Sequence, residues 1–160
     1  MKIIIFDLGD TLEHTVQGKD ILMSGAKELL SEIQNMHDHN GDSPALALVS
    51  DFDKPAEEYY ALLQTLGIDN SFERITLSNE IGVMKPDEKI FRAAIDKIQK
   101  GLSYQNAIFI TEEKQHTTAV RKLGMMAIKL KVAEEENGEA NSLLEMIPLI
   151  QLFVLIPGSQ

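Results

Sequence analysis

Short apolar runs that alternate with amphipathic segments most constrain how this chain can fold. The runs are rich in β-branched residues and are bounded by turn signals, which is typical of strands buried on both faces. The segments between them carry apolar residues at helical spacing. We expect strands at residues 2–6, 45–49, 74–77, 107–110 and 126–130, and helices at 26–36, 55–66, 87–98, 117–123 and 142–150.

This alternation predicts an α/β fold with three layers, in which helices cover both faces of a Rossmann-like parallel five-stranded sheet. A chain of 160 residues can bury a core without disulfides, so we expect a single domain spanning residues 1–160. Residues 37–43 and 133–139 are rich in Gly, Asn and acids and are expected to be loops.

Composition excludes several classes of function. The chain has no cysteine, so disulfides and thiolate metal sites are excluded. Its net charge of −10 disfavours binding to nucleic-acid backbones or anionic membranes, although a local lysine and a bound cation still allow a small phosphorylated substrate. The first apolar run is too short for a signal peptide or a membrane span, so a cytoplasmic location is expected.

Polar side chains gather where the expected strands end, and parallel sheets bind ligands at that edge. Asp7 ends the first strand, Ser50 follows the second, and Lys85 comes soon after the third. The fourth strand ends in a threonine followed by Glu112 and Glu113. A carboxylate, a lysine, hydroxyls and paired acids suit attack on an electron-poor phosphorus.

This chemistry also predicts the sheet order. The strand that carries Asp7 should be central, flanked by the strands that end at Ser50 and Glu112. The expected order is therefore third, second, first, fourth, fifth. Charge compensation requires Lys85 to lie within about 4–6 Å of Asp7.

Four segments in this order resemble the motifs of the haloacid dehalogenase-like (HAD) superfamily, in its phosphoglycolate-phosphatase-like branch. They are FDLGDTL, LALVSD, SNEIGVMKPDEKIF and IFITEEKQHTTAVRKLGM. The resemblance covers nearly the whole chain. It implies hydrolysis of a phosphomonoester through an aspartyl-phosphate, with Mg²⁺ as the cofactor.

The resemblance also implies a role for each matching residue. Asp7 would be the nucleophile, and Lys85 would neutralise Asp7 and the phosphoryl group. Ser50 would bind a phosphoryl oxygen, and Thr11 would support the loop at the substrate site. The implied Mg²⁺ ligands are the Asp7 carboxylate, the Gly9 carbonyl, Glu112 and Glu113.

Three positions depart from the family pattern. Gly9 replaces the second Asp of DxDxT, which is the family's usual general acid/base. Thr111-Glu112 stands in place of Gly-Asp, and His116 stands where a further acid is expected. A positioned acid/base contributes about 10²–10⁴-fold, so hydrolysis without one should be slow or specialised. The alternative is a catalytically idle relative that serves as a binding or regulatory module.

No segment between the motifs is long enough for a cap domain. Between Thr11 and Ser50 there is room for a loop and one helix. The site should therefore be open to a phosphorylated small molecule or a macromolecular phosphoester. Dehalogenation is less favoured, because it needs a closed apolar pocket.

Overall fold

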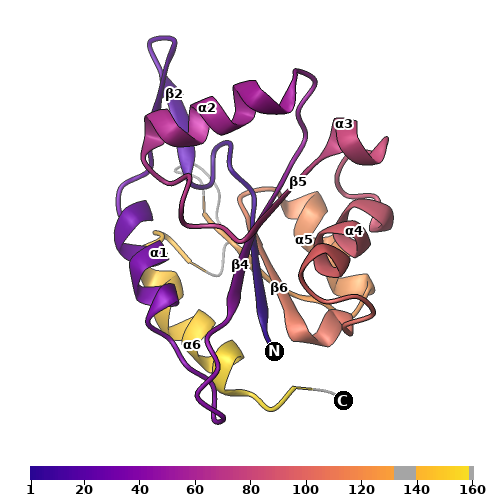
Figure 1. The fold of residues 1–160 in the computed structure, drawn as a ribbon. Coiled ribbons are helices and arrows are strands. Elements are labelled where there is room, and N and C mark those ends of the chain that lie inside the picture. Colours follow the sequence, from indigo (N-terminus) through magenta and orange to yellow (C-terminus); the bar gives the residue numbers. More distant parts are fainter. Residues whose placement is uncertain (132–139, 159–160) are drawn as a thin grey trace.

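The computed structural model describes residues 1–131 and 140–158, so the loop expected at 133–139 lies outside the described residues. Its main sheet confirms the expected fold class, with five parallel strands in the order β5-β4-β1-β6-β7 (Figure 1). This is the order that the placement of Asp7 predicted. The strands are β1 (Ile3–Phe6), β4 (Ala45–Ser50), β5 (Arg74–Leu77), β6 (Ala107–Thr111) and β7 (Met126–Lys129).

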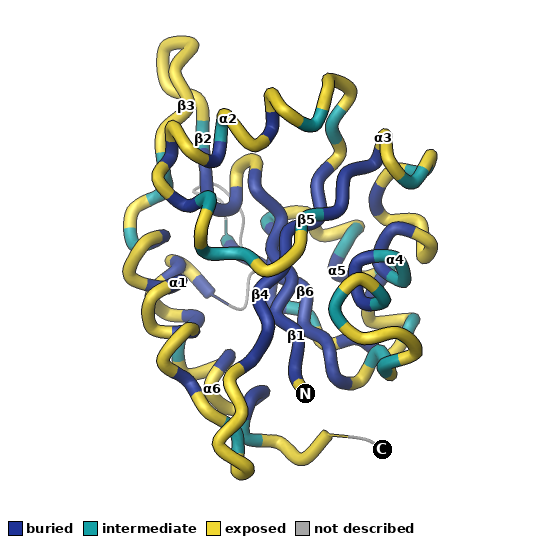
Figure 2. The backbone as a smooth tube through the Cα atoms, in the orientation of Figure 1, coloured by how far each residue is buried: buried dark blue, intermediate teal, exposed yellow. Residues whose placement is uncertain are grey.

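The central strand β1 is apolar throughout because both of its faces are covered. Ile4 and Phe6 belong to the core on one side of the sheet, whereas Ile3 and Ile5 belong to the core on the other. All four side chains are fully buried, and the tube in Figure 2 is dark blue along this strand. Alternation of side chains along a strand thus places one hydrophobic run in two cores.

Helices form the outer layers on both sides of the sheet (Figure 1). One core contains side chains of α1 (Ala26–Gln34), α2 (Ala56–Leu66) and α6 (Ile147–Leu155). The other contains side chains of α4 (Glu88–Ile98) and α5 (Lys114–Lys122). A short helix, α3 (Ser78–Ile81), follows β5 directly.

The last helix differs from its predicted position. It runs over Ile147–Leu155 rather than 142–150, after a 3₁₀ turn at Leu144–Met146. Pro148 lies in its first turn, where the missing N–H of proline costs no helical hydrogen bond. Helix α5 begins at Lys114 instead of 117, and the loop expected at 37–43 is confirmed.

A β-hairpin stands where the sequence analysis expected only a loop. Strands β2 (Glu13–Val16) and β3 (Lys19–Leu22) pair antiparallel directly after the turn that follows β1. Gln17 and Gly18 join them with φ values of 51° and 75°, and two consecutive positive φ values are the mark of a tight hairpin turn. Figure 1 shows the hairpin projecting at the end of the molecule where β1 finishes.

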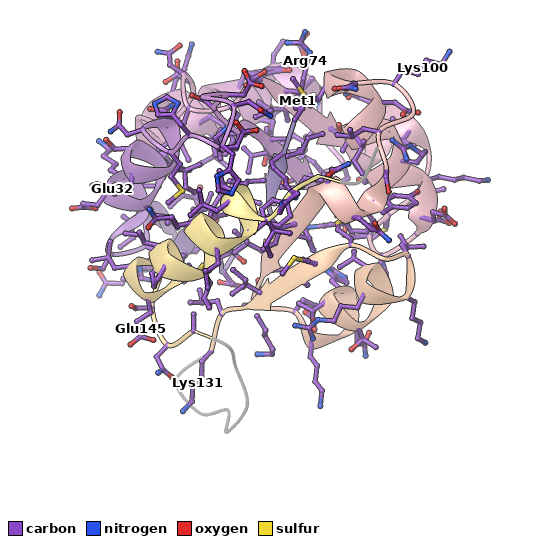
Figure 3. All side chains as sticks on the ribbon, turned by 90° about the horizontal axis from the view of Figure 1, so that it is seen from below. Met1, Glu32, Arg74, Lys100, Lys131 and Glu145 are labelled. Atoms are coloured by element: carbon purple, nitrogen blue, oxygen red, sulfur yellow. The ribbon has the colours of Figure 1, made fainter. Side chains whose placement is uncertain are left out.

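The described chain contains no cap domain, as expected. The hairpin and α1 fill the connection from β1 to β4, and α2, β5 and α3 fill that from β4 to Lys85. Charged side chains such as Glu32, Lys100 and Glu145 point outward from the ribbon in Figure 3. Within residues 1–131 and 140–158, no helix is both long and apolar enough to cross a bilayer.

We predict that Phe91→Ala lowers the free energy of unfolding by about 3–5 kcal/mol, because it empties a fully packed site. Phe91 is fully buried, and its ring meets that of Phe109 edge to face, with centroids 5.0 Å apart. Urea denaturation measures the loss. Leu152→Ala, at a side chain that is 61% exposed, is the control and should change stability by less than about 0.5 kcal/mol.

Candidate active site

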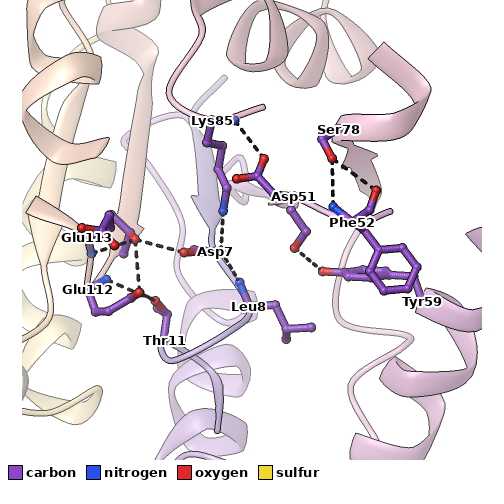
Figure 4. Close-up of polar contacts among 12 residues, drawn as sticks. Asp7, Leu8, Thr11, Asp51, Phe52, Tyr59, Ser78, Lys85, Glu112 and Glu113 are labelled. Atoms are coloured by element: carbon purple, nitrogen blue, oxygen red, sulfur yellow. Dashed lines mark hydrogen bonds and ion pairs between the residues drawn. The ribbon is translucent and has the colours of Figure 1, made fainter. Parts of the chain in front are cut away.

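Asp7 lies at the carboxyl end of β1, and three groups hold its carboxylate (Figure 4). Oδ1 accepts hydrogen bonds from the Leu8 N–H at 2.9 Å and from the Lys85 Nζ at 2.5 Å. Oδ2 accepts a hydrogen bond from the Thr111 hydroxyl at 3.1 Å. The residue is only 8% exposed. The carboxylate is therefore fixed in one orientation at the edge of the sheet.

Lys85 forms a buried ion pair with Asp7, which confirms the contact that the sequence analysis required. Its side chain is 4% exposed, and that of Asp7 is 11% exposed. The backbone N–H of Lys85 donates to Asp51 Oδ1 at 2.8 Å. Asp51 directly follows β4, so it ties the lysine loop to the neighbouring strand. The sequence analysis assigned no role to Asp51.

Hydrogen bonds from threonine hydroxyls link Glu112 to Asp7. Its Oε2 accepts a hydrogen bond from Thr11 at 2.6 Å and lies 3.3 Å from the Thr111 hydroxyl that also contacts Asp7. Burial raises the pKa of Glu112, the nearby Asp7 carboxylate raises it further, and the hydrogen bond from Thr11 opposes both. Two carboxylates thus lie close to one hydroxyl. The sequence analysis placed Thr111 at the end of its strand but assigned it no role.

The remaining expected residues occupy different parts of this edge. Thr11 is fully buried, and its hydroxyl braces Glu112. Glu113 is exposed, and its N–H donates to the Thr111 hydroxyl at 3.1 Å. Ser50, at the end of β4, is hydrogen-bonded to the hydroxyl of Tyr59 at 2.5 Å.

Tyr59 comes from α2 and was not identified from the sequence. It is buried, and its ring packs edge to face against Phe52 at a centroid distance of 5.0 Å. Burial raises the pKa of the Tyr59 hydroxyl, so this group is neutral and can donate or accept a hydrogen bond. Its position orients the Ser50 hydroxyl, and only the folded structure brings the two residues together.

Gly9 has no side chain, but a carboxylate from the hairpin lies beside it. The φ of Gly9 is outside the left-handed region, and a Cβ built there would have Glu13 Oε2 as its nearest neighbour, at 3.9 Å. Glu13 is only 7% exposed. Burial, followed by the nearby Asp20 carboxylate, raises the pKa of Glu13 to about 7. The sequence analysis missed Glu13 because it lay in an expected loop.

His116 lies on α5 on the Glu113 side of the site. Its Nδ1 is buried, and within the described part of the chain it has no hydrogen-bond partner. Burial lowers the pKa of His116 and the nearby Lys85 lowers it further, whereas Asp7 opposes this shift. The imidazole is therefore held neutral next to the ion pair.

Among the described residues, no three His, Asp or Glu side chains are grouped so that they could hold a metal ion. This includes His37 and His39 in the 37–43 loop, where the His37 ring is hydrogen-bonded to Ser43. A cavity of about 630 Å³ opens at the opposite edge of the sheet, beside Lys2 and Asn106. It is remote from Asp7, and its lining includes Pro157 and Gly158.

Comparison with solved structures identifies the fold. A haloacid dehalogenase-like family protein from Streptococcus pneumoniae, SP0104, aligns with a TM-score of 0.73 and 14% identity over 94% of this chain and 99% of that one. CbbY from Rhodobacter sphaeroides, solved with phosphate, aligns with a TM-score of 0.68 and 15% identity over 91% of this chain and 96% of that one. The HAD family enzyme bt-2542 from Bacteroides thetaiotaomicron was solved with magnesium and inorganic phosphate. It aligns with a TM-score of 0.65 and 13% identity over 86% of this chain and 98% of that one.

These likenesses show that the chain has the HAD-like fold. The chain spans 56% and 60% of the length of two longer proteins with this fold. No family model matches the sequence. The comparison with curated proteins gives no match either.

We predict that Lys85→Met lowers the free energy of unfolding by about 3–5 kcal/mol, because it leaves the buried Asp7 carboxylate without a cation. The double variant Asp7→Asn/Lys85→Met removes both charges and should recover most of that loss. Urea denaturation in EDTA measures both. Equal stabilities for the single and double variants would show that the ion pair does not govern stability here.

Glu13 makes stability depend on pH. Its pKa is raised in the folded state to about 7, so the folded protein binds more protons than the unfolded chain, and stability falls as pH rises from about 4.5 to 7. Glu13→Gln removes this dependence. In EDTA, we expect the variant to gain about 1–3 kcal/mol relative to wild type between pH 4.5 and pH 8. A stability difference that is constant over this range would contradict the prediction.

Proposed function

We propose that this protein is a Mg²⁺-dependent phosphomonoester hydrolase that acts through an aspartyl-phosphate on Asp7. The observation that carries the proposal is the buried Asp7 carboxylate, oriented by Leu8 and Thr111 and paired with Lys85 at 2.5 Å. A carboxylate nucleophile needs a fixed approach and compensation of charge as a phosphoryl group arrives. Both conditions are met at the sheet edge where α/β folds bind ligands.

Lys85 and Ser50 act on the phosphoryl group in this proposal. The lysine ammonium lies against Asp7 and can stay in contact with the nucleophile and the incoming oxygens, so negative charge is offset throughout the transfer. The Ser50 hydroxyl, oriented by Tyr59, is on the strand next to β1 and can donate to a phosphoryl oxygen. Thr11 acts indirectly by holding Glu112.

The donors near Asp7 fit a magnesium ion. Asp7 and Glu112 both contact the hydroxyl of Thr111, and Mg²⁺ in phosphate-processing sites usually takes one or two carboxylates together with substrate oxygens and water. The absence of a group of three ligands among the described residues is compatible with this use. The Gly9 carbonyl and Glu113 would complete the protein's ligands. When bound, the ion supplies positive charge to the phosphoryl oxygens.

The HAD-like fold supports the same reaction class, because one protein that shares it was solved with magnesium and inorganic phosphate and another with phosphate. We propose a phosphorylated small molecule or a macromolecular phosphoester as the substrate. The described residues place no cap domain over Asp7, so a large substrate can reach it. The net charge of −10 disfavours an extended polyanion such as a nucleic-acid backbone.

The proposal predicts hydrolysis of an aryl phosphate that requires both Mg²⁺ and Asp7. Asp7→Asn should reduce the rate to that of buffer, and Lys85→Met should reduce kcat by about 10²–10³-fold, because it removes a charge that stabilises the transition state. Lys122→Met, an exposed lysine at the end of α5, is the matched control. Circular dichroism confirms that each variant is folded.

A calorimetric titration with Mg²⁺ and beryllium fluoride tests the site without turnover. Tight, Asp7-dependent binding of this phosphoryl mimic is expected. Binding without any hydrolysis would favour the alternative of a binding or regulatory module. If neither binding nor hydrolysis depends on Asp7, the proposed function is wrong.

A further inference from the structure

Glu13 is a buried carboxylate that packing alone does not explain. It is 7% exposed, and none of the ion pairs in the described part of the chain includes it. Its side chain has a long contact with Thr15, at 3.4 Å, and a hydrogen bond with the carboxyl group of Asp20, so neither of these partners is a cation. Burying an acid without a cation is unfavourable. A residue in this position therefore calls for a functional explanation.

The hairpin places this carboxylate next to the loop that carries Asp7. The Glu13 N–H donates to the Leu8 carbonyl at 3.0 Å, and Gly9 and Glu13 form an isolated β-bridge. Glu13 Oε2 is 3.9 Å from the Cβ that a side chain at residue 9 would have. The carboxylate oxygens of an aspartate lie roughly 2–3 Å from their own Cβ. Glu13 Oε2 thus borders the space into which an aspartate side chain at residue 9 would extend.

We propose that Glu13, carried on the β2–β3 hairpin, is the proton donor and acceptor of this site, in the place that the missing side chain of Gly9 leaves free. The proposal rests on the proposed phosphatase function and assigns to that reaction a catalytic residue outside the four sequence motifs.

Glu13 would act once in each half of the reaction. In the first half, an Asp7 oxygen bonds to phosphorus, the bond from phosphorus to the leaving oxygen breaks, and the Glu13 carboxyl gives its proton to that oxygen. In the second half, the Glu13 carboxylate takes a proton from water as the water oxygen bonds to phosphorus. The bond from phosphorus to Asp7 then breaks and inorganic phosphate leaves. Glu13 ends protonated and Asp7 ends as a carboxylate, so the cycle closes.

Other acids near the site are placed less well for this role. Asp10 is exposed and has a φ of 57°, so its side chain leaves the turn in a different direction from that of residue 9. Asp20 is exposed on β3, where it accepts a hydrogen bond from Thr15. His116 lies on α5 next to the ion pair of Asp7 and Lys85, but it is not within 4 Å of the Cβ position at residue 9. Glu13 alone among these combines burial with proximity to Gly9.

The test compares two substrates whose leaving groups differ in their need for a proton. An alkyl phosphate needs a proton donor, whereas 2,4-dinitrophenyl phosphate does not. For Glu13→Gln we expect kcat on the alkyl phosphate to fall by about 10²–10⁴-fold. With dinitrophenyl phosphate, one equivalent of dinitrophenolate should appear rapidly and slow turnover should follow, because the aspartyl-phosphate forms but water is no longer activated.

Two further variants sharpen the test. Glu57→Gln, at an exposed acid of α2, should behave as wild type. Gly9→Asp/Glu13→Gln should regain at least about tenfold of the lost rate, because the backbone at residue 9 accepts a side chain and the new carboxylate would lie next to the position of the Glu13 carboxylate. Binding of Mg²⁺ and beryllium fluoride to Glu13→Gln should persist, which shows that the nucleophile site is intact.

The outcomes separate the two proposals. If wild type shows Asp7-dependent turnover and folded Glu13→Gln releases both leaving groups equally slowly in the first turnover, or slows neither substrate, the role of Glu13 is overturned and the phosphatase proposal stands. If wild type shows no Asp7-dependent hydrolysis of either substrate, both proposals fail. A selective loss with the alkyl phosphate, a burst with the aryl phosphate and rescue by Gly9→Asp support the assignment.

Discussion

The buried ion pair between Asp7 and Lys85 is the interaction on which the organisation of this end of the molecule depends. Each charge alone would be costly to bury. The pair therefore holds the end of β1 against the loop before α4, with Lys85 Nζ 2.5 Å from Asp7 Oδ1. Asp51 fixes the lysine backbone and Thr111 fixes the carboxylate, so β4 and β6 are tied to the same point. The site is therefore a junction of three adjacent strands.

The parallel sheet makes this junction possible. Strands β4, β1 and β6 run in one direction and pair without an offset that would separate their ends. Whatever follows the last buried residue of each strand must therefore gather at one edge. The two hydrophobic cores on the faces of β1 hold the strands rigidly enough for side chains at that edge to keep fixed distances.

The sequence predicts the fold well because the signals that determine it are local. Alternation of buried runs and helical spacing identified all five strands of the main sheet, and residue chemistry at their ends predicted both the strand order and the contact between Asp7 and Lys85. The β2–β3 hairpin was not predicted from the sequence because its strands are short and largely polar.

The contacts that escaped prediction depend on the folded chain. The position of α2 brings the Tyr59 hydroxyl to Ser50. The contact of Thr111 with Asp7 is likewise known only from the hydrogen bond in the folded structure. Glu13 is the clearest case, because only the folded hairpin brings its carboxylate next to Gly9, 3.9 Å from the Cβ that a side chain there would have. The roles assigned to the site residues stay predictions; these residues are Asp7, Gly9, Thr11, Ser50, Lys85, Glu112 and Glu113.

The tight turn at Gln17 and Gly18 determines how the β2–β3 hairpin presents its side chains. It determines which residues of β2 and β3 face each other, and a slip of one residue in a strand pair turns every side chain to the other face. Asp7 belongs to the rigid sheet, whereas Glu13 belongs to the hairpin at its edge. In the proposed reaction, a mutation in that hairpin therefore changes proton transfer to the leaving oxygen and from water, while the position of Asp7 in the sheet stays unchanged.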